Sequence, residues 1–280
     1  MAFEIGSRIN CILHYCGEGI VYAIHGEQRP ESVETLGGFI QRGGSATFDV
    51  VFLNGSVSKN LPEAVILGVQ WSKLEGVATA EEIAEALAHS ACVKAAKASA
   101  ADMAARRYAD AVDALKVDPA FKRLVQDEDT HSGKLAARNI RTQLKAAFPG
   151  VKFSVTKRSY GALNVEWLDG PTPEAVAQIT GPYVSGSFDG MEDLYTSHVT
   201  PWNAVFGGAK YIFDRRETSD ALTQAAIDEV FNTHGGLDGI EKPTPANLGR
   251  NYTPVPGYAY ELSTLVRIQA AKMEGAPCAS

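Results

Sequence analysis

The chain has 280 residues, of which 45% are hydrophobic and 21% charged, as is ordinary for a soluble globular protein. This length predicts two domains, because single hydrophobic cores rarely grow so large. No apolar run is long enough to span a bilayer, no secretory signal is visible at the start, and four cysteines are too few for a disulfide framework. We therefore expect a cytoplasmic protein with no membrane partner.

The net charge of −7 is unevenly distributed along the chain. Residues 94–158 hold 14 Lys and Arg against 7 Asp and Glu, whereas the remainder holds 12 basic and 26 acidic residues. A uniformly acidic protein would be a poor partner for nucleic acid, but a cationic middle can still bind phosphate. Alternatively, the two halves attract one another or a second copy, and the cationic region is internal.

Residues 1–76 predict a small β-barrel of the SH3 type. Short segments bounded by Gly, Pro, Asn and Ser indicate strands at residues 8–15, 19–25, 39–42, 46–53 and 65–71. Within the fourth segment, Phe48, Val50 and Phe52 share one face, and Asn54-Gly55 favours a hairpin. Four or five short strands in this length are typical of a small curled barrel.

Residues 79–128 predict a helical connector. Thr79 and Glu82 form a capping box, in which the hydroxyl binds the backbone N–H of Glu82 and the carboxylate reaches back. An alanine-rich helix follows to about residue 115, with a break expected near Ser99, and Asp118-Pro119 ends it.

Residues 131–235 predict a two-layer α-β-β-α domain, so the fold class is α+β. A helix at 132–148 ends at Pro149-Gly150, and strands follow at 151–156 and 162–168. Further helices are expected from Pro173 and at 218–232. Residues 236–280 then predict an extended connector followed by a helix at 260–273, which covers the core or joins a second copy in a homo-oligomer.

Three separated phrases support a resemblance: residues 144–155 (LKAAFPGVKFSV), 165–172 (VEWLDGPT) and 187–193 (SFDGMED). Together, over about residues 132–215, they resemble a large polyvalent protein-associated domain. The phrases at 19–26 (GIVYAIHG) and 48–52 (FDVVF) resemble an accessory barrel of the same proteins. The resemblance implies an accessory protein of a phage or conjugative plasmid. The resemblance implies no catalytic residue and no cofactor. It suggests an anti-restriction role or another role that blocks a host defence.

A basic surface is the first candidate site. At 100° per residue, Lys134, Arg138, Arg141 and Lys145 fall in one narrow sector of the predicted helix, away from Leu135, Ala136, Ile140, Leu144 and Ala147. Lys152, Lys157 and Arg158 add charge on the hairpin, near Tyr160 and Trp167 in sequence. Phosphates need cations and unstacked bases need aromatic faces, so nucleic acid or another acidic partner is predicted. The alternative is a solvated helix face with Trp167 in the core.

An acidic cluster is the second candidate. Asp189, Asp193 and His198 offer oxygen and imidazole ligands for a metal ion, and Asp189 and Asp193 share a face if this segment is helical. The alternative is that Asp189-Gly190 caps a helix. Cys11, His14 and Cys16 form a weaker cluster, because zinc prefers four ligands and the two thiols point to opposite faces of a strand.

Three functions are therefore considered, of which the first is favoured and the other two are alternatives. The first is a non-enzymatic accessory protein that binds and blocks a host defence protein complex. The second is a nucleic-acid-binding protein that uses the basic face of residues 134–158. The third is a metal-dependent hydrolase built on Asp189, Asp193 and His198.

Overall fold

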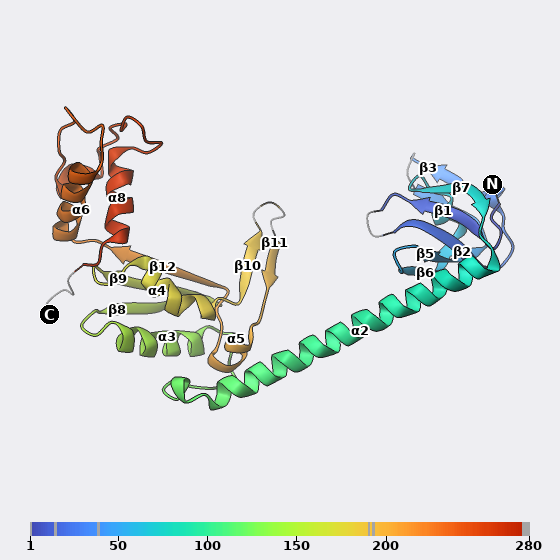
Figure 1. Ribbon diagram of the computed structural model, residues 1–280, viewed down its shortest axis with the longest axis horizontal. Coiled ribbons are helices and arrows are strands. Elements are labelled where there is room, and N and C mark those ends of the chain that lie inside the picture. Colours follow the sequence, from blue (N-terminus) through green and yellow to red (C-terminus); the bar gives the residue numbers. More distant parts are fainter. Residues whose placement is uncertain (1, 14–15, 38–39, 190, 192–193, 276–280) are drawn as a thin grey trace. The chain divides into compact units, whose positions relative to one another are not determined.

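A computed structural model describes residues 2–13, 16–37, 40–189, 191 and 194–275. The chain divides into two compact units, Met1–Arg106 and Arg107–Ser280, and the division falls inside the long helix α2 (Ala80–Val117). Figure 1 shows the elements of both units. An antiparallel sheet, helices and a second sheet make up the chain, which confirms the predicted α+β class. Within the described ranges, no helix has the length and apolar character needed to cross a membrane.

The first unit is built on a five-stranded antiparallel sheet with the order β6-β5-β2-β1-β7. Its strands are β1 (Ser7–Cys11), β2 (Gly17–His25), β5 (Thr47–Phe52), β6 (Val57–Pro62) and β7 (Trp71–Val77). The 3-10 turn η1 (Pro30–Ser32) leads into a separate hairpin of β3 (Glu34–Leu36) and β4 (Ile40–Arg42). Strands β6 and β7 are the two edges of the five-stranded sheet. Closure into an SH3-like barrel therefore stays a prediction.

Strand β5 is buried on both of its faces. As predicted, Phe48, Val50 and Phe52 share one face, where they pack in the core of the first unit. Val51 points the other way and packs with Ile20 and with apolar side chains at the start of α2. The first turns of α2 therefore complete the packing of this sheet.

The strand expected at residues 65–71 is wrong. The short helix α1 (Glu63–Ile66) and a turn occupy most of this segment, and β7 begins only at Trp71. The Glu63 carboxylate fixes the helix start, because it accepts backbone N–H groups of Arg29, Ser45 and Ala46. These bonds join segments far apart in sequence, so local pattern could not reveal them.

Helix α2 runs for 38 residues without the break expected near Ser99. The predicted capping box is confirmed: the Thr79 N–H donates to Glu82 Oε2 at 2.7 Å, and the Glu82 N–H donates to Thr79 Oγ1 at 3.2 Å. Arg8 of β1 also donates to the Glu82 carboxylate, at 2.6 Å. Ser90 is the one buried residue within this fully described helix. Strong alanine propensity, rather than burial, therefore supports most of its length.

The second unit contains a three-stranded sheet with the order β12-β9-β8. Its strands are β8 (Phe153–Ser159), β9 (Ala162–Leu168) and β12 (Tyr211–Glu217). The expected hairpin is present, although β8 begins and ends later than predicted. Strand β12 was missed by the prediction, and it pairs parallel with β9. Parallel pairing requires a crossover, which here runs through several short elements.

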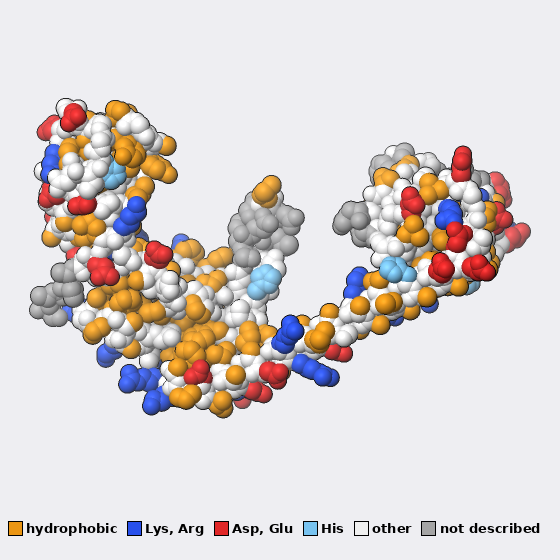
Figure 2. All heavy atoms as spheres, in the orientation of Figure 1, with side chains coloured by type: hydrophobic (Ala, Val, Ile, Leu, Met, Phe, Trp, Pro, Cys, Tyr) orange, Lys and Arg blue, Asp and Glu red, His pale blue; other side chains and the backbone are white. Residues whose placement is uncertain are grey.

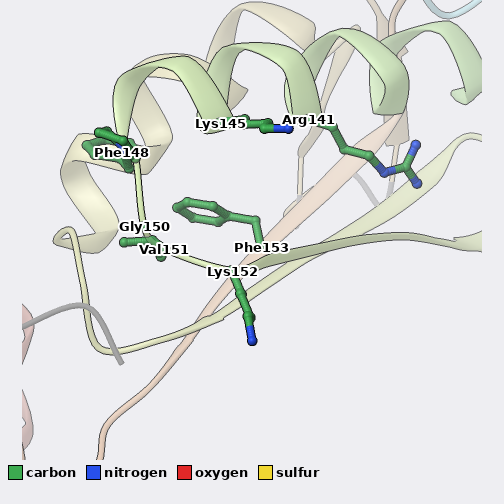
Figure 3. Close-up of a pocket in the computed structure, with 8 residues that line it drawn as sticks. Arg141, Lys145, Phe148, Gly150, Val151, Lys152 and Phe153 are labelled. Atoms are coloured by element: carbon green, nitrogen blue, oxygen red, sulfur yellow. The ribbon is translucent and has the colours of Figure 1, made fainter. Parts of the chain in front are cut away.

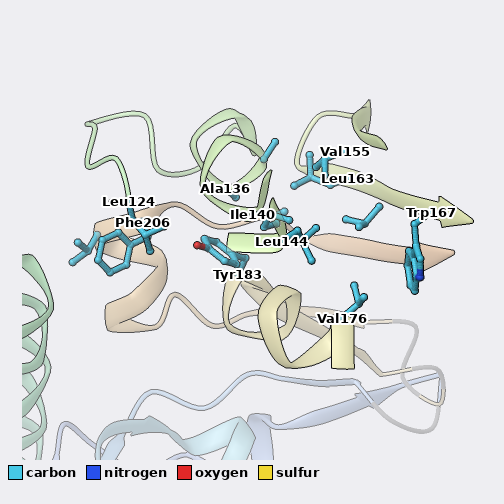
Figure 4. Close-up of a cluster of buried hydrophobic side chains, with 14 residues drawn as sticks. Leu124, Ala136, Ile140, Leu144, Val155, Leu163, Trp167, Val176, Tyr183 and Phe206 are labelled. Atoms are coloured by element: carbon cyan, nitrogen blue, oxygen red, sulfur yellow. The ribbon is translucent and has the colours of Figure 1, made fainter. Parts of the chain in front are cut away.

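Those elements are short and lie between β9 and β12. They are α4 (Pro173–Thr180), the 3-10 turn η3 (Gly181–Tyr183), β10 (Gly186–Asp189), β11 (Leu194–Ser197) and α5 (Pro201–Phe206). Helix α3 (Lys134–Ala147) precedes the sheet and follows the 3-10 turn η2 (Pro119–Phe121). Figure 4 shows the core between these helices and the sheet, with side chains from α3, β9 and α4 meeting around Tyr183. Trp167, 3% exposed, belongs to this core, as the alternative interpretation of this residue expected.

The C-terminal part forms a third hydrophobic cluster around α6 (Asp220–Thr233), α7 (Pro245–Leu248) and α8 (Leu262–Lys272). The apolar side of α8, with Leu262, Leu265 and Val266, packs against α6 and against Val255. The connector expected before α8 is therefore anchored by buried side chains. The apolar face of α8 is covered within the chain itself, and a homo-oligomer through this helix stays a prediction.

Candidate nucleic-acid interface

The predicted basic stripe lies on the exposed side of α3. Lys134, Arg138, Arg141 and Lys145 are all exposed. The opposite side carries Leu135, Ala136, Ile140 and Leu144, all buried, whereas Ala147 is exposed at the helix end. Figure 2 shows Lys and Arg side chains gathered on the α3 side of the second unit. The sequence therefore placed the charged and buried sides of this helix correctly.

A buried amide holds α3 in place. Asn139 is fully buried, and its Nδ2 donates to Val125 O at 2.8 Å and to Phe206 O at 2.9 Å. Its Oδ1 accepts the Val125 N–H at 2.8 Å. Just before the helix, Asp129 accepts two hydrogen bonds from Ser132, which lower the pKa of the Asp129 carboxyl. These contacts fix how the basic side of α3 is presented.

A groove of about 480 Å³ opens where α3 ends and β8 begins. Arg141 and Lys145 line it from the helix, and Lys152 lines it from the segment before the strand (Figure 3). Phe148 and Phe153 supply apolar walls, with ring centroids 6.0 Å apart. The groove thus combines three cations with two aromatic rings, a pairing suited to phosphate and base.

Arg141 also braces the helix against the sheet. Its Nη2 donates to the carbonyl of Val155 on β8. Strand β8 is an edge strand, and edges leave backbone groups unpaired. Below the groove, the Phe153 and Trp167 rings lie 5.7 Å apart, and Trp167 Nε1 donates to Pro171 O at 3.0 Å. The wall of the groove therefore continues into the core.

Lys157 and Arg158 lie at the other end of β8, away from the groove. Lys157 Nζ lies 5.4 Å from the centroid of the exposed Tyr160 ring. The Arg158 guanidinium carbon lies 4.9 Å from the Phe213 centroid. The six cations predicted as one site are therefore distributed along α3 and β8, and only Arg141 and Lys145 share the groove.

Other residues of this surface were missed by the prediction. Lys122 and Arg123 line a second groove, of about 370 Å³, together with Thr142 and Gln143 of α3. Their basic dipeptide was a usable signal, because it lies within the cationic middle of the chain. A second signal is the absence of carboxylates: no Asp or Glu occurs between Asp129 and Glu166, a stretch with seven Lys and Arg.

The acidic candidate is not helical where it is described. Asp189 ends β10 and pairs with Leu194 of β11, so the alternative of a helix cap is wrong. His198 follows β11, and its backbone N–H donates to Ser185 O at 2.8 Å. Asp193 lies outside the described residues. In the part of the chain that the structure covers, no three His, Cys, Asp or Glu side chains group as metal ligands would.

The cysteine cluster is part of the core of the first unit. Cys11 and Cys16 are both buried there, because the strand ends at Cys11 and the chain turns back, so the expectation of opposite faces is wrong. His14 lies outside the described residues. Burial and the neighbouring Cys11 raise the pKa of Cys16 to about 11, which keeps this thiol protonated and unreactive.

Two family models match the chain, and their limits follow the structural elements. Large polyvalent protein associated domain 30 matches residues 1–119, which include the five-stranded sheet and α2. Large polyvalent protein associated domain 29 matches residues 131–219, from α3 to β12. The chain carries two large polyvalent protein associated domains. The second match confirms the resemblance inferred for residues 132–215.

Such domains are found in proteins of phages and other mobile elements. Comparison with curated proteins and with solved structures gave no match. The basic surface lies inside the domain 29 match, whereas α6, α7 and α8 follow it. The groove, the aromatic rings around it and the hairpin cations therefore belong to a single polyvalent-protein domain.

Proposed function

We propose that this protein binds nucleic acid through the basic surface of α3 and β8. The observation that carries the proposal is the groove that Arg141, Lys145 and Lys152 line, together with two phenylalanine rings. Among the described residues, no carboxylate lines this groove, and the sequence from residue 130 to 165 contains none. Cations without acidic partners attract phosphates most strongly.

The rest of the chain is acidic, which limits binding to this surface. Residues outside 94–158 hold 26 acidic side chains against 12 basic ones. A phosphate backbone that approaches elsewhere meets repulsion, so the protein's own field guides nucleic acid to the α3 side. Binding of this kind depends on salt, because each neutralised phosphate releases condensed counterions.

The test is a titration of labelled single- and double-stranded DNA and RNA at low and near-physiological salt. The variant R138E/K145E reverses two exposed charges on α3. We expect a large loss of affinity, and a salt slope reduced by about 0.9 for each phosphate contact removed from a duplex. The matched control, R250E/K272E, reverses two exposed cations beyond the domain 29 match and leaves affinity nearly unchanged. Unaltered binding by R138E/K145E would show that α3 is not the site.

A second candidate function follows from the setting of these domains in phage and mobile-element proteins. The protein would act as an accessory factor that counteracts a host defence system by binding a defence protein or its nucleic-acid substrate, without catalysis. Phage plating on a restricting host provides the test. We expect the intact chain to raise plating efficiency and R138E/K145E to remove the effect. Equal plating with and without the chain, across several defence systems, would refute this role.

A further inference from the structure

One face of the β12-β9-β8 sheet is left uncovered within the described chain. Helices α3 and α4 pack on the other face, against Leu163, Val165 and Trp167 of β9. On the uncovered face, the register aligns Thr156, Asn164 and Phe213 across the three strands. Thr156 and Phe213 are exposed and Asn164 is half-buried. We call this surface the open face.

Aromatic and basic side chains gather at one end of the open face, around the β8–β9 turn. This aromatic end consists of Arg158, Tyr211 and Phe213 on the open face, and of Lys157, Tyr160 and Lys210 at the adjoining strand ends and turn. The Tyr211 and Phe213 rings stack with centroids 6.2 Å apart and an angle of 22° between their planes. Tyr160 is 72% exposed and Phe213 is 43% exposed. Among the described residues, Tyr160, Tyr211 and Phe213 do not belong to the buried core of the second unit, and exposed aromatic rings of this kind often mark a binding surface.

The Phe213 and Tyr160 rings each have a cation next to them. Arg158 lies over Phe213, and Lys157 lies over Tyr160. The Lys210 side chain lies against Gly161 in the turn between β8 and β9. The two carboxylates of the open face are further along: Glu166 aligns with Arg215, and Glu217 aligns with Leu168 at the opposite end. The aromatic end is therefore cationic.

We propose that the aromatic end stacks the unpaired bases of a single-stranded nucleic acid. This inference rests on the proposed function, nucleic-acid binding, and specifies that the nucleic acid is single-stranded. A single strand offers free base faces to aromatic rings, whereas the bases of a duplex are already stacked on one another. Arg158 and Lys157 would then neutralise the phosphates that flank the stacked bases. Charge complementarity favours this occupant over an apolar protein surface. Contact with an apolar surface would remove water from the three cations without giving them a partner, which costs free energy.

The aromatic end and the groove of the basic surface lie at opposite ends of the same strand. Strand β8 carries Lys157 and Arg158 at one end, and the groove with Lys152 and Phe153 lies at its other end. β8 is an edge strand of seven residues, so a single strand that follows it spans several nucleotides. Bases would stack at the aromatic end while the backbone continues towards Arg141 and Lys145.

The experiment compares oligothymidine with a duplex of equal length, using the full chain. Wild type is expected to bind the single strand more tightly. The variant Y211T/F213T keeps β-branched residues in the strand but removes both rings, and we expect single-strand affinity to fall about tenfold to a hundredfold with duplex affinity unchanged. Y252T removes a 68% exposed ring from the C-terminal part and serves as the matched control.

A second readout locates the contact. Photocross-linking with iodouracil-substituted oligonucleotide, followed by peptide mapping, is expected to label Tyr160, Tyr211 or Phe213. If Y211T/F213T does not fold, Y160T in the exposed turn repeats the affinity test without altering a strand. Cross-links confined to α3 would overturn the inference.

The remaining outcomes separate the two proposals. Equal affinity for both substrates, unchanged by the aromatic variants but lost in R138E/K145E, would refute base stacking and leave the proposed function intact. Absence of binding to any nucleic acid would refute both. Self-association that Y211T/F213T abolishes, without nucleic-acid binding, would assign the open face to a second copy and also overturn the inference.

Discussion

Asn139 is the residue whose loss should most directly disturb the presentation of the basic surface. It is fully buried on α3 and joins the helix to two other segments, through Val125 before the helix and Phe206 at the end of α5. The perturbation we choose is Asn139→Leu, because leucine has a similar volume. It removes the amide without opening a large cavity.

The magnitude follows from the three hydrogen bonds. Each contributes about 1 kcal/mol net, and a buried backbone group left without a partner costs about 1–3 kcal/mol. Val125 N–H, Val125 C=O and Phe206 C=O all lose their partner together. Some regain water, so we expect the second unit to lose about 3–5 kcal/mol of unfolding free energy.

Amide hydrogen exchange of the full chain measures this loss, with residues 1–106 as an internal reference. Protection should fall in α3, β9 and α5, and remain unchanged in the five-stranded sheet. Thr142→Ala is the matched control on the same helix. Its hydroxyl bonds only locally to Arg138 O, so a change within about 0.5 kcal/mol is expected. If Asn139→Leu is as stable as wild type, or if both units lose protection equally, the reasoning is refuted.

Three further predictions concern single residues. Glu63→Gln should cost the first unit about 2–3 kcal/mol, measured by urea unfolding, because a buried carboxylate that accepts three backbone N–H groups loses its charge. Burial raises the pKa of Glu63, but those N–H groups lower it further, to a net value below 4.5. Wild type should therefore lose stability as pH falls from about 4.5 through this lower folded-state pKa, and Glu63→Gln should not show this loss. Burial raises the pKa of Asp214 above its ordinary value of 3.8. The second unit should therefore lose stability as pH rises from 3.8 to this higher folded-state pKa. Asp214→Asn should flatten this pH dependence in thermal melts between acid and neutral pH. Gly207→Ala should destabilise the second unit by about 1–3 kcal/mol, since φ is +87° there and a Cβ would lie 2.7 Å from the Ala136 nitrogen; an unchanged melting temperature would contradict this.

Much of the local structure was predictable because it depends on neighbours in sequence. The capping box of Thr79 and Glu82, the helix at Lys134–Ala147 and the strand at Ala162–Leu168 all follow local pattern and termination signals. The exposure of the basic side of α3 follows from the same periodicity. Three separated phrases also sufficed to infer the polyvalent-protein resemblance that the family match confirms.

Elements that depend on distant partners were not predictable in this way. β12 pairs with β9 through residues as far apart in sequence as Ala162 and Tyr211. The local sequence of a strand does not indicate which distant strand it will pair with in parallel. The segment around Asp189 forms a hairpin rather than a helix, which removes the shared face assumed for its carboxylates. The break expected near Ser99 does not occur, because the high helix propensity of the surrounding alanines favours a continuous helix.

By itself, the sequence determined the charge of residues 94–158, the two sides of α3 and the membership of the second domain. Only the tertiary structure decided which cations meet. It places Arg141, Lys145 and Lys152 around one groove, and it brings Arg158 to Phe213 across the sheet. The physical reason is that periodicity fixes a residue's side within one element, whereas strand register and helix packing fix which elements become neighbours.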